Sequence, residues 1–442
     1  MVNPQHLGSV AARALVYFSA RPSSNTQALS NNPLNSTQSL SSSNNTVGSQ
    51  ILAADKATYS QNTASAVTAL QGWYNKDTGL WKTTGWWNAA NCLQVLMDFT
   101  LYDRARSDSL GLRSVASNTF TQAQQNTAMA NKVMQVDTGL VVSSYEPLLN
   151  GMAKRGKEFQ RLAKRQGFGG FINDFYDDEG WWALAWIRSY DNYKDPGHLD
   201  IAENIFEDMR QGGDNTCGGG IWWSKERKYK NAIANQLYLA VAASLSNRSG
   251  TKKSSSYYRD IAVKQWAWLK GSGMINSDNL FNDGLTINAN GSCTNNGMQT
   301  WTYNQGVVLG GLVELSSQTG DKTLIDDAYR IATAAVTKMT TSSGILKESC
   351  EPGNCGGDGP QFKGVLARNI RQLILAADSH ANRAMLRDFI LRNADSVWAK
   401  DRNPANNQLG IVWSGPYNAG KEPGADTQSS AMDVLVAAMA VA

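Results

Sequence analysis

Histidine is scarce in this sequence, with three residues in 442, and cysteine is limited to five. Structural metal centres usually combine these residue types at short spacings, and no such set is present. Basic and acidic side chains nearly cancel, 41 against 37, so the net charge of +4 does not predict a groove for nucleic acid. We therefore expect no metal, no cofactor and no nucleic-acid partner.

Long apolar runs are also missing. No stretch approaches the roughly 20 apolar residues of a membrane-spanning helix, and the last residues, DVLVAAMAVA, lack the polar spacer of a lipid-anchor signal. Arg13 interrupts residues 7–20, so a standard signal peptide is not visible. The basic run at 154–165 is typical of the solvated face of a surface helix. We expect a monomer without a membrane anchor.

The few cysteines nevertheless indicate an oxidising compartment. Cys350 and Cys355 enclose a short loop rich in Gly and Pro, which predicts a disulfide. Cys217 and Cys293 lie in polar loops, and the sequence leaves their pairing open, whereas Cys92 falls in an apolar helical run and is expected to be buried and free. The secreted or cell-wall location that follows agrees with the glycosylation motifs at Asn35, Asn44, Asn247 and Asn290.

Two segments differ sharply in composition. Residues 21–50 are rich in Ser, Asn and Thr and offer little apolar surface to offset the entropy of ordering, so 1–50 is expected to be a disordered lead-in. Residues 51–442 contain 14 Trp within an otherwise helical pattern and are expected to form one catalytic domain.

That domain repeats one pattern six times: an amphipathic helix, a Gly-rich loop, then a helix that is apolar nearly all round. The apolar helices are expected to begin near Trp86, Trp181, Asn231, Trp301, Lys363 and Asp426. Helices with a polar stripe, at 198–210, 258–270 and 322–339, alternate with them. Apolar helices are buried and striped helices face solvent, so the pattern predicts an inner and an outer ring, an all-α (α/α)6 barrel, or toroid, of six helical hairpins. An open solenoid would have shorter and more even repeats.

Adjacent carboxylates, Asp177 and Asp178, stand at the start of a Trp-rich helical segment, DDEGWWALAW. Together with Glu179 they could simply stabilise the positive end of the helix dipole, although capping rarely needs three acids. Side chains of neighbouring residues diverge by roughly 5–6 Å, which suits a retaining glycosidase better than an inverting one. The faces of tryptophan rings stack on sugar rings, so a glycosidase active site is the more specific interpretation.

Around this pair the chain resembles glycoside hydrolase family 76, the secreted α-1,6-mannanases of fungi and bacteria. The resemblance rests on DFYDDEGWWALAWI and on CGGGIWW, KNAIANQLYL, WTYNQG, the ESCE loop and QFKGVLARN, and it extends from about Ile51 to the C-terminus. It implies an (α/α)6 barrel and retaining, endo-acting cleavage of α-1,6-mannan or mannoprotein glycans. It also implies that Asp177 is the nucleophile and Asp178 the acid/base.

Further residues are expected at the cleft because they lie where the inner helices begin. The aromatic candidates, for which core packing is the alternative, are Trp86, Trp87, Trp181, Trp182, Trp222 and Trp301. The polar candidates, for which hydrogen bonds between helices are the alternative, are Asn88, Asn231, Asn235, Tyr303, Asn304, Gln305, Lys363 and Arg368. Of these we favour ligand contact for Asn231, Gln305 and Lys363.

Three other functions fit parts of the sequence. A cell-wall transglycosidase would use the same pair to pass a mannosyl group to a sugar hydroxyl, but the missing anchor signal argues against it. A sugar-binding protein with a dead site would have lost one acid, and both are present. A helical scaffold would not explain a polar, Trp-rich cleft at one end.

Overall fold

A computed structural model describes residues 55–126, 128–135, 140–147, 170–377 and 379–442. The expected lead-in at 1–50, the motifs at Asn35 and Asn44, and the basic run at 154–165 lie outside the described residues.

Within the described residues the chain forms six helical hairpins, each with an outer helix followed by an inner one. The outer helices are α1 (Lys56–Gln71), α4 (Leu112–Ala123), α7 (Pro196–Arg210), α9 (Ser255–Gly271), α11 (Thr323–Lys338) and α13 (Arg383–Lys400). The inner helices are α2 (Trp86–Tyr102), α6 (Tyr176–Tyr193), α8 (Ala232–Ser246), α10 (Thr302–Thr319), α12 (Phe362–Ala376) and α14 (Ala425–Val441). A short helix, α3 (Arg104–Ser109), links α2 to α4.

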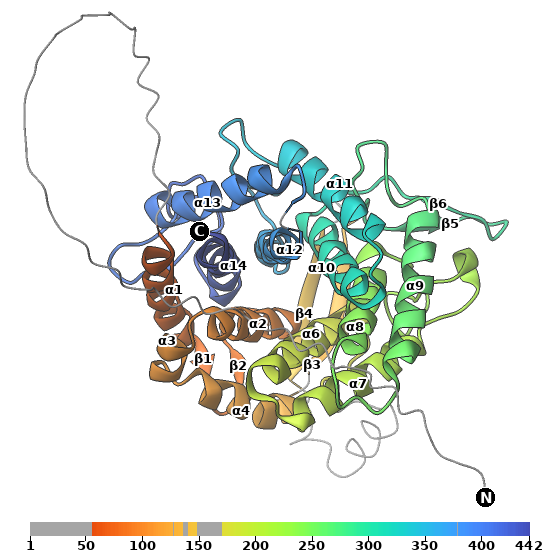
Figure 1. Cartoon of the computed structure of the whole chain (residues 1–442), viewed down its shortest axis with the longest axis horizontal. Coiled ribbons are helices and arrows are strands. Elements are labelled where there is room, and N and C mark those ends of the chain that lie inside the picture. Colours follow the sequence, from red (N-terminus) through yellow and green to blue (C-terminus); the bar gives the residue numbers. More distant parts are fainter. Residues whose placement is uncertain (1–54, 127, 136–139, 148–169, 378) are drawn as a thin grey trace, which may run out of the picture. The chain divides into compact units, whose positions relative to one another are not determined.

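The inner helices close into a ring. Each contacts the next in chain order, and α14 returns to contact α2. Figure 1 shows this ring along its axis, with the outer helices around it. The predicted all-α toroid is confirmed.

Burial explains the two rings. Every residue of α8 is buried, and so is α2 from Trp86 to Thr100, whereas α7 buries a single stripe that includes Leu199, Ala202 and Phe206. A helix that is covered on all sides must be apolar on all sides, while an outer helix needs only one apolar face.

Glycine lets some inner helices approach very closely. A Cβ on Gly306 of α10 would lie 2.7 Å from the Cα of Leu366, and one on Gly364 of α12 would lie 2.6 Å from the Cα of Ser430 on α14. Backbone fills the space that any side chain would need, so these helices could not pack this tightly without glycine.

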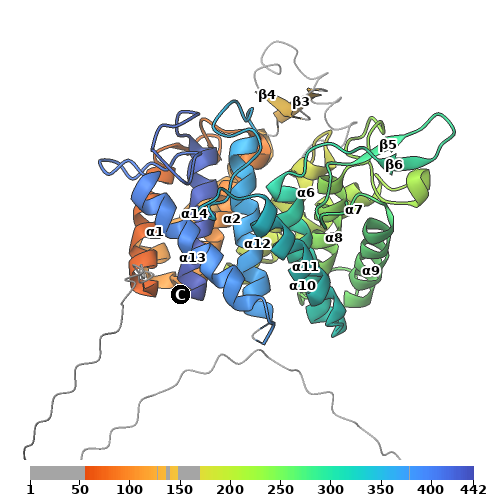
Figure 2. The same ribbon diagram turned by 90° about the horizontal axis from the view of Figure 1, so that it is seen from above.

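Loops and short strands gather at the end where the inner helices begin (Figure 2). Among the residues that the structure describes, three antiparallel hairpins are formed by β1 (Tyr74–Asn75) with β2 (Leu80–Trp81), β3 (Ala128–Met134) with β4 (Val141–Pro147), and β5 (Leu285–Ile287) with β6 (Cys293–Asn295). Single 3-10 turns lie at Gln124–Asn126, Thr216–Gly218 and Gly359–Gln361. The β3–β4 hairpin is the longest of the three, and the sequence pattern had not predicted it.

Two disulfides tie these loops together. Cys350 bonds to Cys355, as predicted, and Cys217 bonds to Cys293, which settles the pairing that the sequence left open. Cys92 is free and buried in α2, as expected.

The starts of the inner helices agree with the sequence pattern to within one residue, except in α6. The apolar run suggested a start near Trp181, but α6 begins at Tyr176. Asp177, Asp178 and Glu179 therefore form its first turn, because carboxylates are favoured beside the free N–H groups and the positive end of a helix.

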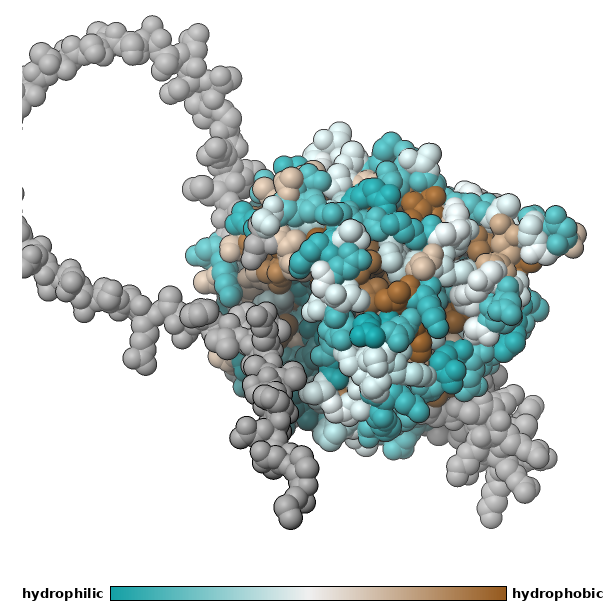
Figure 3. Space-filling view, turned by 45° about the vertical axis from the view of Figure 1, so that its right-hand side comes forward, coloured by the Kyte–Doolittle hydropathy of each residue, from teal (hydrophilic) through white to brown (hydrophobic). Residues whose placement is uncertain are grey.

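None of the described helices is both long enough and apolar enough to span a bilayer. On the face drawn in Figure 3, hydrophobic residues form small separate groups within a mostly hydrophilic surface.

Candidate active site

The first turn of α6 is held by the loop on either side of it. The Asn173 side chain accepts a hydrogen bond from the Phe175 N–H (2.8 Å), which bends the chain into the helix. The Tyr176 N–H donates to the carbonyl of Trp223 (3.0 Å) and fixes the helix start against the neighbouring loop. Two adjacent carboxylates are thereby carried on a rigid element at one mouth of the toroid.

Asp178 is fully buried. It accepts hydrogen bonds from Asn173 Nδ2 (2.8 Å) and from Lys132 Nζ (2.5 Å). Burial raises the pKa of Asp178 to about 7, and the nearby charge of Asp177 adds to this, although Lys132 and Asn173 oppose it. A carboxyl group with this pKa can hold a proton near neutral pH and release it during a reaction.

Asp177 is more open, with 6% of its surface exposed. Its Oδ2 lies 3.2 Å from the same Lys132 nitrogen, and its Oδ1 has no hydrogen-bond partner among the described residues. Since both acids contact one nitrogen, their facing oxygens are at most about 5.7 Å apart, which is compatible with the spacing of retaining glycosidases.

Glu179 faces away from this pair. Its Oε1 accepts a hydrogen bond from the Asn173 backbone N–H (3.1 Å) and lies 3.2 Å from Lys225 Nζ. Burial raises its pKa well above the usual range. Glu179 therefore braces the loop ahead of the helix.

A cavity of about 20 Å³ lies over Asp177. Trp87 and Trp181 stack on one side of it (ring centroids 5.3 Å apart), and Tyr303 and Phe362 stack on another (3.9 Å). Its complete lining is Trp87, Lys132, Met134, Val141, Asp177, Trp181, Trp223, Asn231, Asp283, Tyr303, Asp358 and Phe362.

Two more carboxylates face this cavity. Asp358 accepts hydrogen bonds from Trp87 Nε1 (2.8 Å) and Ser143 Oγ (2.5 Å), and burial raises its pKa. Asp283 accepts one from the Tyr229 hydroxyl (2.6 Å), and burial raises its pKa to about 6. No cluster of three His, Cys, Asp or Glu suited to a metal ion occurs in the part of the chain that the structure describes. The cation among these acids is Lys132.

The structure brings some of the predicted subsite residues to this cavity. Trp87, Trp181, Asn231 and Tyr303 all line it. Asn231 also caps α8 by accepting a hydrogen bond from the Ala234 N–H (3.3 Å). Asn304 is fully buried and does not line the cavity, and its side-chain amide has no hydrogen-bond partner among the described residues.

Other predicted aromatic residues pack elsewhere. Trp86 contacts Trp182, which also packs on Phe171 in the core. Trp222 donates its Nε1–H to Asp214 (2.7 Å), and Trp301 packs against Phe362 just before α10. Each of these four tryptophans is buried and outside the cavity lining, so core packing is the interpretation that the structure favours for them.

The favoured polar candidates Gln305 and Lys363 also lie outside the lining. Gln305 bonds to the backbone N–H and carbonyl of Phe281 (2.8 and 2.9 Å). Lys363 contacts Glu351 (2.6 Å) and the Ile411 carbonyl (2.5 Å). Hydrogen bonds within the protein satisfy both, so they need no ligand.

Two further predicted residues are internal as well. Asn235 bonds to the backbone of Ile221 through both ends of its amide (2.7 and 2.9 Å), and Asn88 is wholly buried in α2. Neither lines the cavity.

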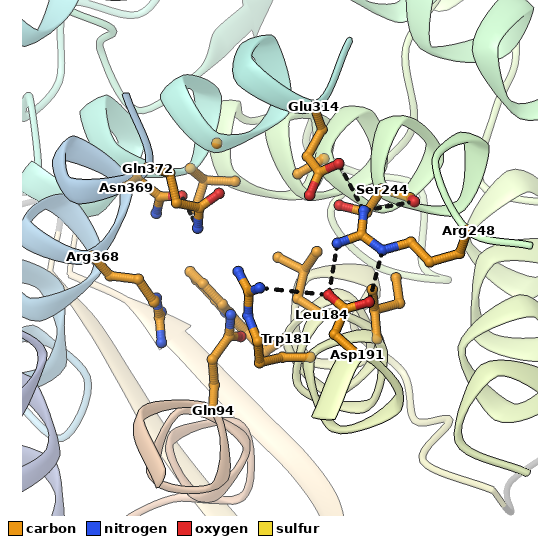
Figure 4. Close-up of a pocket in the computed structure, with 15 residues that line it drawn as sticks. Gln94, Trp181, Leu184, Asp191, Ser244, Arg248, Glu314, Arg368, Asn369 and Gln372 are labelled. Atoms are coloured by element: carbon orange, nitrogen blue, oxygen red, sulfur yellow. Dashed lines mark hydrogen bonds and ion pairs between the residues drawn. The ribbon is translucent and has the colours of Figure 1, made fainter. Parts of the chain in front are cut away.

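Arg368 faces a different space. It lines a second cavity of about 30 Å³, and Trp181 forms a wall of both. Figure 4 shows charged side chains around this space: Arg248 contacts Asp191 (2.8 Å) and Glu314 (2.7 Å), and Arg368 extends from α12. Charges that are already paired with one another leave this space little capacity for a ligand.

The pattern of inner-helix starts could not find Lys132, Asp283 or Asp358, because all three lie in loops or on the β3–β4 hairpin. Asp358 follows the predicted disulfide loop at Cys350 and Cys355, so that motif was the available signal for it. Lys132 belongs to the strand AMANKVM, in which Val133 is the single β-branched residue and apolar and polar residues do not alternate, so the strand was not recognisable from its sequence.

Adjacent carboxylates and stacked aromatic rings at the mouth of an (α/α)6 toroid define a carbohydrate-cleaving enzyme. The chain belongs to glycosyl hydrolase family 76, whose model matches residues 51–442.

Curated relatives support this assignment. The mannan endo-1,6-α-mannosidase DFG5 of Candida albicans is 24% identical over 382 residues, which cover 80% of this chain and 72% of the relative. The enzyme of the same name from Saccharomyces cerevisiae is 28% identical over 278 residues, 59% of this chain and 58% of the relative.

Solved structures share the fold. An inactive α-1,6-mannanase variant from Salegentibacter, in complex with α-1,6-mannotriose, matches with a TM-score of 0.68 and 21% identity over 87% of this chain and 100% of that one. Dfg5 from Chaetomium thermophilum, in complex with glucosamine, matches with a TM-score of 0.67 and 17% identity over 89% of this chain and 92% of that one.

Proposed function

We propose that this chain hydrolyses α-1,6-mannosidic bonds within mannan backbones, with retention of configuration. The observation that carries the proposal is the Asp177–Asp178 pair at the mouth of the toroid. Curated relatives are named mannan endo-1,6-α-mannosidases, and the Salegentibacter mannanase is described as inactive when two consecutive aspartates are replaced by asparagine.

The two acids divide the reaction between them. Asp177, the more exposed one, attacks the anomeric carbon and forms a covalent glycosyl ester. Asp178, whose pKa is raised to about 7, gives its proton to the departing glycosidic oxygen. It then takes a proton from a water molecule that attacks the ester, which releases the sugar with its original configuration and regenerates both acids.

The walls of the site suit a mannan chain. The faces of Trp87, Trp181 and Tyr303 offer apolar surfaces on which sugar rings stack. The carboxylates of Asp283 and Asp358 accept hydrogen bonds, and sugar hydroxyls can supply them. Two disulfides fit action outside the cell, on cell-wall or extracellular mannan.

Two substitutions test the assignment. Asp177→Asn and Asp178→Asn should each lower turnover on linear α-1,6-mannan by about a thousandfold or more, because an amide can neither form the ester nor transfer the proton. Asp174→Asn, on the same loop but outside the cavity lining, is the matched control and should stay active. Circular dichroism would check that all three variants fold.

Proton NMR of the first product tests the stereochemistry, and the α anomer is expected. Near-normal activity in either variant of the pair would remove that acid from the mechanism. A β product would mean that the reaction inverts.

A further inference from the structure

The β3–β4 hairpin lies across the mouth that holds the acid pair. It crosses the ring when viewed along the axis (Figure 1) and covers the end where the inner helices begin (Figure 2). Side chains alternate between the two faces of a hairpin, so the register of the strands shows which side chains face the cleft and which face away from it. Lys132 lies opposite Ser143 on the inner face, while Val133 and Val142, 57% and 41% exposed, pair on the outer face.

The inner face is fastened to the cleft by polar contacts. Lys132 Nζ lies 3.2 Å from Asp177 Oδ2 and 2.5 Å from Asp178 Oδ1, and its side chain is only 2% exposed. The rings of Phe175 and Trp223 flank the ammonium at 4.9 and 5.7 Å. Lys132 thereby engages one oxygen of each acid, and Asn173 engages the second oxygen of Asp178.

Contacts elsewhere along the hairpin hold it down. Ser143 Oγ donates to Asp358 Oδ2 (2.5 Å), and Leu140, 5% exposed, packs on Gly356 in the loop after the Cys350–Cys355 bridge. The Tyr145 ring lies directly against Gly85, just before α2. The hairpin therefore bridges three of the loops that frame the cleft.

A substrate must reach the acid pair, but Lys132 and Asn173 engage both oxygens of Asp178, and Lys132 also engages Oδ2 of Asp177. A nucleophile reacts from about 3–3.5 Å, and a general acid must reach the leaving oxygen at roughly 2.6–3.2 Å. The ammonium already holds both acids at such distances. The space left is about 20 Å³, enough for one or two water molecules, whereas ligand clefts measure about 300–1,000 Å³.

We propose that the β3–β4 hairpin is an internal plug, with Lys132 as a built-in competitor of the substrate, and that the plug must leave before a mannan chain can bind. This inference rests on the proposed function. A buried carboxylate pair needs a countercharge, and Lys132 supplies it while the site is empty. When the hairpin lifts, Lys132 withdraws from both acids and becomes solvated, and the cleft opens to its full size.

The plug should affect the steady-state kinetics in a recognisable way. If only a fraction of the molecules is open, the apparent affinity for every substrate falls by that same fraction. Weakening the plug should therefore lower KM by one common factor for short and long substrates. It should leave kcat unchanged, because chemistry takes place only in the open state.

Lys132→Met keeps the length of the side chain and removes its charge. On both α-1,6-mannotetraose and mannan, we expect KM to fall by about tenfold or more with kcat unchanged. Ser143→Ala should produce a smaller decrease in KM in the same direction, because it loosens the hairpin at a different point. Val133→Ser, the neighbouring residue on the outer face, is the matched control and should leave KM unchanged.

Hydrogen exchange supplies a readout that does not depend on activity. Binding of a thio-linked, non-hydrolysable α-1,6-mannotriose should speed exchange of the backbone amides in β3 and β4. Slower exchange in β3 and β4, or either a higher KM or a lower kcat in Lys132→Met, would make Lys132 part of the site that binds and cleaves the sugar and would overturn the plug.

Failure of the plug can be told apart from failure of the proposed function. Unchanged KM for both Lys132→Met and Ser143→Ala, in a protein that still cleaves mannan, would refute the plug alone. Loss of the mannanase assignment would instead appear in the Asp177→Asn and Asp178→Asn variants.

Discussion

Asp177 and Asp178 are neighbours in sequence but differ in surroundings. Asp178 points into the protein, where burial raises its pKa to about 7, whereas Asp177 faces the cavity with one oxygen unpaired among the described residues. Like charges so close resist ionising together, so a shared proton settles on the more deeply buried acid. This difference supports the roles proposed for the two residues.

The pH dependence of the reaction should report Asp178. Its pKa is raised, so the proton it must donate is present below about pH 7 and is lost as the pH rises through that value. We expect kcat/KM on α-1,6-mannan to fall above pH 7. Asn173→Ala removes a hydrogen bond that stabilises the carboxylate, so the fall should move to higher pH.

Asn118→Ala is a suitable control for that measurement. Asn118 lies on the outer helix α4 and donates to the Lys76 carbonyl (2.8 Å), far along the chain from the acid pair. Its pH profile should match that of the wild type. A profile for Asn173→Ala that stays in place, or moves to lower pH, would mean that another group controls the fall.

The two disulfides constrain loops of very different length. Cys350–Cys355 spans 5 residues and precedes Asp358 at the cavity wall, while Cys217–Cys293 spans 76 and joins loops outside the cavity lining. A longer closed loop restricts the unfolded chain more strongly. The short bridge therefore serves mainly the shape of the site, and the long bridge mainly stability.

Replacing each pair of cysteines by serine should separate these effects. Loss of the Cys350–Cys355 bridge should cost about 2 kcal/mol of stability, and loss of Cys217–Cys293 about 4–5 kcal/mol. KM for α-1,6-mannan should change more in the variant without Cys350–Cys355. Thermal unfolding and steady-state kinetics measure the two effects, and the reverse ranking of KM changes would refute the division.

The toroid buries several acids whose pKa is raised. Burial raises the pKa of Asp283 to about 6, of Glu348 and Asp433 to about 7, and of Asp401 to about 8. The folded protein thus keeps protons that the unfolded chain has already released. Stability from these groups is complete below about pH 4 and is lost as the pH rises through their folded pKa values.

Acids that form ion pairs change the stability in the opposite direction as the pH rises. Asp98 is fully buried, yet Arg371 (2.9 Å) and Arg188 (2.8 Å) outweigh its burial and lower its pKa. The contribution of Asp98 is present above about pH 4 and is lost in stronger acid. The two groups of acids together place the greatest stability at mildly acidic pH.

The melting temperature should therefore be higher at pH 5 than at pH 8. Asp401→Asn is neutral at every pH, so it should reduce this difference by removing one of the groups that lose a proton. Asp388→Asn, whose side chain is 66% exposed, should leave the difference unchanged. A wild-type melting temperature that rises from pH 5 to pH 8 would contradict the prediction.

Much of the molecule could be predicted from short-range patterns. An inner helix is apolar on every side, and an outer helix has a single apolar stripe. Both patterns can be recognised within one short segment of the sequence. The acid pair was recognisable because two carboxylates before a Trp-rich run are adjacent in sequence. Cys350 and Cys355 were predicted for the same reason, since only five positions separate them.

The residues that line the site could be identified only from the tertiary structure, because they come from segments far apart in sequence. Gln305 and Lys363 are polar and stand at helix starts, yet internal hydrogen bonds satisfy both of them away from the cavity. Lys132 is 45 positions from Asp177, and only the packing of the hairpin across the ring brings the two together. Burial and charge pairing are set by these long-range contacts, so the sequence could name the two acids but not the lysine between them.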